Sequence, residues 1–177
     1  MAYEQRLTKM KTMPLFHLAL NVLLLCGCAT EKHRALQRNK EIIQRYFEGW
    51  ANHGDTTVAD ELVATNVVLH NPPAFISSLT DYKKGMAGFH AAFPDLRFTI
   101  EDQVAESDKV AVRWILRGTQ MAEYQGHPPS QKTMTVTGVS IFRIAEGKIQ
   151  EIHVCLDRHG MMEQLGWLPA VVPPPPK

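Results

Sequence analysis

The stretch KTMTVTGVSIFRIAEGKIQEIHVCLD, Lys132 to Asp157, contains two runs of β-branched and apolar residues separated by the turn sequence AEGK. This pattern predicts two strands joined as a hairpin. The preceding runs LRFTIEDQVAE and DKVAVRWILRGTQ predict two more strands with ESDK as their turn, and MAEYQGHPPSQ predicts a loop between the hairpins. The second half of the chain therefore predicts an antiparallel sheet of strands adjacent in sequence.

Helical periodicity dominates the first half of the chain. Between residues 31 and 52 apolar side chains recur every three or four positions, which predicts a long amphipathic helix. Shorter helices are predicted over VADELVA and YKKGMAGFHAAF, and TNVVLHNPP between them predicts a strand that ends at a proline corner. Three helices followed by a sheet form an α+β fold. We expect a cone-shaped, strongly curved antiparallel sheet that these helices close over a pocket for a small molecule.

Composition limits the class of protein. The 177 residues are 45% hydrophobic and carry a formal net charge of +1, which is typical of one globular domain with an ordinary core. Since nothing indicates a broad positive surface, we do not expect a nucleic-acid partner. The sequence has no glycine-rich phosphate loop and no paired Cys or His residues at metal-ligand spacing, so it predicts neither a metal nor a cofactor.

The N-terminal segment differs from the rest of the chain. A basic start, an apolar run from Leu15 to Leu25 and then small residues have the layout of a secretory signal, and the run is too short to span a bilayer comfortably. LCGC, Leu25 to Cys28, resembles a bacterial lipobox, which implies that residues 1–27 are removed and that Cys28 becomes lipidated. We expect an exported protein anchored on the periplasmic side of the membrane, in the outer membrane if the bacterium is Gram-negative; an ordinary signal peptide is the alternative.

The remaining cysteines follow from this cleavage. Cys26 would leave with the signal peptide and Cys28 would be acylated, so Cys155 stands alone and no internal disulfide is possible. The expected divisions after the signal peptide are a tether at 28–38, the domain at 39–168 and an extended proline-rich tail at 169–177. Stability must therefore come from the core of the domain.

Four ordered motifs carry a resemblance to a known family. HNPP, FPDL, VRWILRGTQ and the segment from Gly126 to Gly166 resemble the SnoaL-like polyketide cyclases or ester cyclases, within the nuclear transport factor 2-like fold. The resemblance implies an intramolecular aldol closure without metal or organic cofactor, in which an Asp near the end of the last strand is base and then acid. The matching position is Asp157. Many relatives carry Trp at the position of His153, so the pocket wall is expected to differ from theirs.

The last strand has two unlike faces. Because side chains alternate, one face would carry Ile149, Glu151, His153, Cys155 and Asp157, and the other Ile152, Val154 and Leu156. The resemblance favours the mixed face as the pocket wall, with His153 as the catalytic partner of Asp157. In the alternative, both residues lie in solvent on the outer face and the apolar set is core. Spacing alone does not decide between them.

Several other residues are candidates for the pocket. Arg113 lies between apolar neighbours on a strand, so an inward side chain would need an anionic substrate group or a carboxylate such as Asp157. His70 precedes the proline corner and would lie at the rim, with an ordinary surface position as the alternative. Tyr46, Trp50 and Phe93 are candidate wall residues, although aromatic residues at helical spacing more often belong to the core.

Three functions remain open from the sequence. The first is a cofactor-free cyclase, isomerase or hydrolase acting on a small apolar carbonyl compound. The second is a lipid-anchored protein that binds such a compound without chemistry. The third is a structural module at the membrane surface that dimerises, since the resemblance implies a homodimer formed through the outer face of the sheet.

Overall fold

The computed structural model describes residues 15–72 and 74–168, and the side chains of residues 30–72 and 75–168. The chain divides into two units, Met1–Ala35 and Leu36–Lys177. The predicted lipidation residue Cys28 lies in the first unit, and its side chain is outside the described residues. Among the described residues, no helix is both long enough and apolar enough to cross a bilayer.

A long first helix is followed by two shorter ones that begin at capping side chains. Helix α1 (Leu15–Arg45) continues into a π-helical segment, η1 (Tyr46–Ala51). The Asp55 carboxylate accepts hydrogen bonds from the first backbone N–H groups of α2 (Thr56–Leu62), and the Ser78 hydroxyl caps α3 (Leu79–Ala92) in the same way. The three predicted helical regions are therefore present, and the first extends further than predicted.

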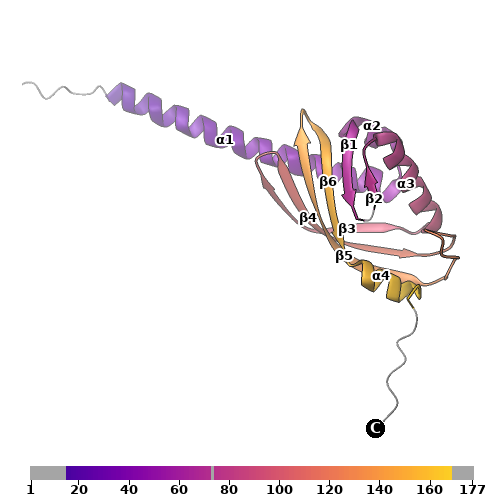
Figure 1. Ribbon diagram of the computed structural model, residues 1–177. Coiled ribbons are helices and arrows are strands. Elements are labelled where there is room, and N and C mark those ends of the chain that lie inside the picture. Colours follow the sequence, from indigo (N-terminus) through magenta and orange to yellow (C-terminus); the bar gives the residue numbers. More distant parts are fainter. Residues whose placement is uncertain (1–14, 73, 169–177) are drawn as a thin grey trace, which may run out of the picture. The chain divides into compact units, whose positions relative to one another are not determined.

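Six strands form one curved, unclosed sheet (Figure 1). The strands are β1 (Val63–Asn71), β2 (Ala74–Ile76), β3 (Arg97–Glu106), β4 (Lys109–Thr119), β5 (Thr133–Ala145) and β6 (Lys148–Leu156), in the order β2-β1-β6-β5-β4-β3. A last helix, α4 (Arg158–Leu165), follows β6. The α+β prediction is confirmed. The sheet is antiparallel except that β1 pairs parallel with β6, and the sequence predicted neither this pairing nor the short strand β2.

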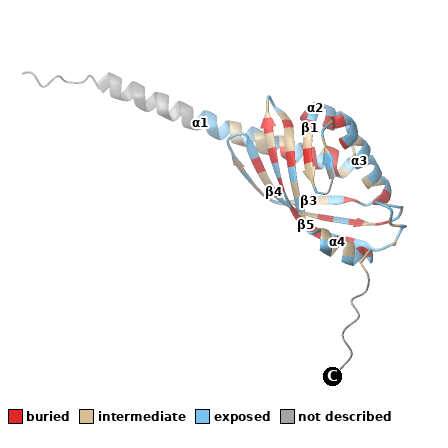
Figure 2. Ribbon diagram, in the orientation of Figure 1, coloured by how far each residue is buried: buried red, intermediate tan, exposed pale blue. Residues whose placement is uncertain are grey.

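The core lies on one face of the sheet. Buried residues alternate with more exposed ones along β4 and β5, as the banding of these strands in Figure 2 shows. Trp114 on β4 lies opposite Gly138 on β5, where a side chain would overlap the indole ring, so glycine makes room for it. The indole N–H of Trp114 donates to the hydroxyl of Ser140 at 2.9 Å. This face carries the cavity described below.

Candidate functional site

A cavity of about 380 Å³ lies between the buried face of the sheet and the helical segments η1 and α3. Its volume is in the range of sites that enclose small organic molecules. Aromatic and aliphatic side chains form most of the wall, among them Phe47, Met86 and Phe142. The predicted pocket for a small, mostly apolar molecule is therefore present.

The polar groups of the wall are few. They are the hydroxyls of Tyr46, Tyr82, Tyr124 and Ser140, the amides of Asn71 and Gln125, and the guanidinium of Arg158. Among the described residues that line the cavity, Arg158 is the one charged side chain, and no Asp, Glu, His or Lys is present. The wall thus offers hydrogen-bond donors and a positive charge, but no carboxylate that could act as a base.

Two tyrosines form a polar pair within the apolar wall. Tyr46 from η1 and Tyr82 from α3 are both buried, and their hydroxyls hydrogen bond to each other. Burial raises the pKa of Tyr82 and raises that of Tyr46 well above its usual value, so both phenols stay protonated near neutral pH. Since a bond between two hydroxyls uses one O–H group, the other can donate to a ligand oxygen.

Arg158 lies where the first turn of α4 meets the end of β1. Its Nη2 donates to the side-chain oxygen of Asn71 at 3.0 Å and to the carbonyl of Pro72 at 2.9 Å. None of the ion pairs among the described residues includes Arg158. Burial raises the pKa of the nearby Tyr124 phenol, and the charge of Arg158 opposes that rise. The guanidinium therefore has donors left for an anionic or carbonyl oxygen.

The orientation of β6 is opposite to the one that the resemblance favoured. Ile152, Val154 and Leu156 line the cavity, whereas the side chain of His153 is 53% exposed. The prediction that the His153 face is the pocket wall is wrong, and the alternative is correct. The apolar set turns inward because the core of η1 and α3 covers that face, while the polar residues pair with one another outside.

A register irregularity explains one further departure. Ile149 was grouped with the mixed face, yet it is fully buried, as is Ile152. The pairing of β5 with β6 shifts register between Arg143 and Ile144, so simple alternation does not hold along the whole strand.

Asp157 caps a helix. Its side chain is exposed and accepts a hydrogen bond from the backbone N–H of Gly160 at 2.8 Å, in the first turn of α4. It is not among the residues that line the cavity. The location therefore differs from the dry pocket in which the acid/base mechanism would need this carboxyl group, and the role itself stays a prediction.

The other predicted site residues separate into wall, core and surface. Tyr46 lines the cavity, as predicted. Trp50 and Phe93 are buried in the core but do not line the cavity. Arg113 is exposed and forms an ion pair with Glu101, so the predicted inward clamp is wrong; its charge is balanced at the surface.

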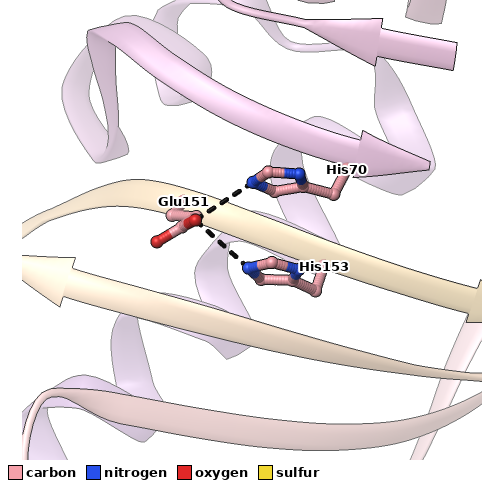
Figure 3. Close-up of side chains that lie close together, drawn as sticks. All are labelled: His70, Glu151 and His153. Carbon is pink, nitrogen blue, oxygen red and sulfur yellow. Dashed lines mark hydrogen bonds and ion pairs between the residues drawn. The ribbon is translucent and has the colours of Figure 1, made fainter. Parts of the chain in front are cut away.

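His70 lies on the same outer face as His153, away from the cavity rim where it was predicted. Both rings hydrogen bond to Glu151, and they stack with centroids 4.1 Å apart (Figure 3). Arg143 donates to the second carboxylate oxygen of Glu151 at 3.1 Å. These contacts hold the pKa of Glu151 below its usual value, with the hydrogen bond from Arg143 as the largest cause. The cluster offers two imidazoles and one carboxylate, the kinds of group that bind metal ions.

Arg158 and Asn71 were not predicted from the sequence, although their immediate neighbours were. Asn71 follows His70 and Arg158 follows Asp157, so each choice was wrong by one residue. Once Ile152, Val154 and Leu156 are known to face the cavity, alternation continued past the end of β6 leads to Arg158. The alternation in the sequence therefore indicates Arg158 only when the cavity-facing side of β6 is already known.

The model of the SnoaL-like polyketide cyclase family matches residues 40–165. The chain belongs to the SnoaL-like polyketide cyclase family. The match covers most of the second unit, including every strand and all of α4. No protein of curated function matches the chain.

Solved structures of similar proteins agree with membership of the SnoaL-like family. A proposed SnoaL-like polyketide cyclase from Jannaschia sp. CCS1 is 26% identical with a TM-score of 0.69, over 75% of this chain and 94% of that one. IdmH, a proposed polyketide cyclase from Streptomyces antibioticus, is 29% identical with a TM-score of 0.64, over 72% and 98%. AclR, a proposed hydroxylase from Streptomyces galilaeus, is 26% identical with a TM-score of 0.67, over 76% and 99%. These names span more than one chemistry, so the fold alone does not select a reaction.

Proposed function

We propose that this protein binds a small, mostly apolar organic compound in the cavity and holds a carbonyl or carboxylate oxygen of that compound against Arg158. The observation that carries the proposal is the single charged residue of an otherwise apolar and hydroxyl-bearing wall, a guanidinium without an ion-pair partner among the described residues. A partly buried guanidinium favours an anionic or strongly polarised oxygen as its partner. Proteins of the SnoaL-like family bind small organic ligands, which supports this reading.

A cyclase or isomerase reaction is the second candidate, and the Tyr46–Tyr82 pair favours it. A carbonyl oxygen that accepts a hydrogen bond from a buried phenol or from Arg158 gains stability as it takes up negative charge, which is what enolisation and aldol closure require. The wall supplies no carboxylate base, so proton removal would depend on solvent or on a group of the substrate. Two of the similar solved structures are named as proposed polyketide cyclases, which adds support to this candidate.

Binding is tested with an apolar aromatic anion as the probe. Anilinonaphthalene sulfonate should bind the purified protein with a rise in its fluorescence. Arg158→Met should weaken that binding by roughly tenfold or more, since charged hydrogen bonds typically contribute about 1.5–3 kcal/mol. Arg113→Met is the matched control, because Arg113 is an exposed arginine on the outer face, and it should bind like the wild type.

Equal affinity of the Arg158→Met variant and the wild type for the fluorescent probe would contradict the proposal.

To separate binding from chemistry, the protein is incubated with a small 1,3-diketone in D₂O and the compound is followed by NMR. Faster exchange of the central C–H in the presence of wild type, reduced in Tyr82→Phe, supports the enzyme. Recovery of the compound without faster exchange leaves the binding function alone.

The exported, lipid-anchored location and the homodimer belong to the same proposal. A tethered ligand-binding protein would meet its compound outside the cytoplasm, where a small apolar molecule arrives by diffusion. Both features rest on the sequence pattern and on the resemblance.

A further inference from the structure

We propose that His70, Glu151 and His153 form a binding site for a divalent cation of the zinc type, on the face of the sheet opposite the cavity. These residues do not line the cavity, so the inference is independent of the function proposed above. Neither the family match nor the names of the similar structures refers to a metal.

The three candidate ligand atoms point to one place. Glu151 Oε1 lies 3.0 Å from Nε2 of His70 and 3.2 Å from Nε2 of His153, and the ligand atoms lie within 4.8 Å of one another (Figure 3). Zinc binds imidazole nitrogen and carboxylate oxygen at roughly 2.0–2.2 Å. A cation between the three atoms would therefore reach all of them after small rotations of the side chains.

Backbone pairing holds these residues in place. His70 is the register partner of His153 across the parallel pair β1–β6, and Glu151 precedes His153 by two residues on the same face. The two imidazole rings are parallel to within 4°, with both Nε2 atoms directed at the carboxylate. Ligands on paired strands lose little freedom when a metal binds, in contrast to ligands on loops.

The donor set selects the kind of metal. Two imidazoles and one carboxylate bind zinc at many catalytic sites, where the fourth position is left to water or substrate. Imidazole also suits copper and nickel, whereas magnesium and calcium prefer sets of oxygen ligands. The cluster therefore favours a transition-type divalent cation over magnesium or calcium. Glu151 and His153 border a hollow of about 300 Å³ on the outer face, so solvent can reach the site in the single chain.

Arg143 has two opposing effects on this site. Its hydrogen bond to Oε2 of Glu151 orients the carboxylate and leaves Oε1 for the cation, as outer hydrogen bonds do for many metal ligands. Its positive charge repels a cation. Because the Arg143 side chain is 39% exposed, solvent and salt screen much of that repulsion, while the ligand bonds act at short range. We expect the ligand bonds to dominate.

The test is a calorimetric titration of the purified full-length protein with zinc chloride. The wild type should bind one equivalent of zinc, and this binding should depend on the His70–Glu151–His153 cluster. In His70→Ala/His153→Ala, and separately in Glu151→Gln, the affinity of that equivalent should fall by at least about tenfold. His159→Ala and Cys155→Ser are controls, because they remove an exposed imidazole and a free thiol outside the cluster, and both should bind like the wild type. Magnesium chloride should produce no comparable binding.

Circular dichroism checks that each variant is folded, and Glu151→Gln decides the question if the double variant is not. The proposal is overturned if the wild type binds no zinc, if zinc binding is unchanged in the double variant and in Glu151→Gln, or if Cys155→Ser loses the equivalent while the cluster variants keep it. Loss of zinc binding in the cluster variants alone supports it. Probe binding in the cavity should be the same in the cluster variants and the wild type, so failure of this proposal and failure of the cavity proposal are distinguishable.

Discussion

Asp157 shows at the residue scale how a family motif can have a structural reason. The spacing D-x-x-G from Asp157 to Gly160 places a carboxylate at the N-cap, where it accepts a hydrogen bond from the backbone N–H of Gly160. A side chain at position 160 would overlap that carboxylate, so glycine fits there. Further along the same motif, Gln164 bonds to both backbone groups of Thr135, and Gly166 ends α4 in the left-handed region. The motif thus attaches α4 to β5.

The FPDL motif has a similar explanation. Asp95 accepts hydrogen bonds from the backbone N–H of Thr119 at 2.6 Å and from its hydroxyl at 2.8 Å. These bonds lower the pKa of Asp95 and join the turn before β3 to the end of β4. Residues that identify the family therefore include residues that hold the sheet and its helix together.

A pair of substitutions separates capping by Asp157 from catalysis by it. Asp157→Ala should lower the free energy of unfolding by about 1 kcal/mol, whereas Asp157→Asn should change it little, because Asn is an equally good N-cap. Urea unfolding measures both. If the Asn variant is destabilised as much as the Ala variant, N-capping does not account for the contribution of Asp157 to stability. If the Asn variant is stable but loses the faster C–H exchange of the 1,3-diketone that the wild type shows, the acid/base role is supported.

At the scale of elements, the outer face of the sheet combines polar and apolar parts. The His70–Glu151–His153 cluster occupies β1 and β6, while Val139 and Ile141 on the neighbouring strand β5 are each 43% exposed. Large aliphatic side chains on the centre of an exposed sheet face are typical of a surface that packs against another molecule. This face is the one that the resemblance assigns to a homodimer.

Lysine on β5 should disrupt such a homodimer. Ile141→Lys would bury a charge in the interface, so we expect light scattering to give the mass of a monomer for this variant and of a dimer for the wild type. Met121→Lys is the control, because Met121 is an exposed apolar residue in a loop outside the sheet. A monomeric wild type, or an Ile141→Lys variant that still dimerises, would show that this face is not the interface.

At the scale of the whole molecule, the N-terminal segment sets the predicted location. A single acyl chain contributes about 0.8 kcal/mol per buried CH₂ group, and the several chains of a bacterial lipoprotein would hold the protein at the membrane. Cys28→Ser should therefore abolish both incorporation of labelled palmitate and partition into detergent when the full-length gene is expressed in a bacterium. Cys155→Ser should retain both. An unlabelled wild type would contradict the lipid anchor.

The sequence alone determined the three N-terminal helical regions, the five longer strands and the turns between them, because these depend mainly on contacts between near neighbours in the chain. The alternation of buried and more exposed residues along β4 and β5 is an example. The family was recognised from its ordered motifs. The parallel pairing of β1 with β6 could not be predicted in this way, since it joins residues as far apart as His70 and Glu151, which are 81 positions apart.

The packing of β6 against the helical segments decided the site. Local periodicity divides a strand into two faces but does not say which one is inward, because the answer depends on what packs against it. The tertiary structure set Ile152, Val154 and Leu156 against η1 and α3, and so brought Arg158 to the cavity and left His153 outside. Burial of apolar area against the helices is the physical reason, and no stretch of the last strand contains that information by itself.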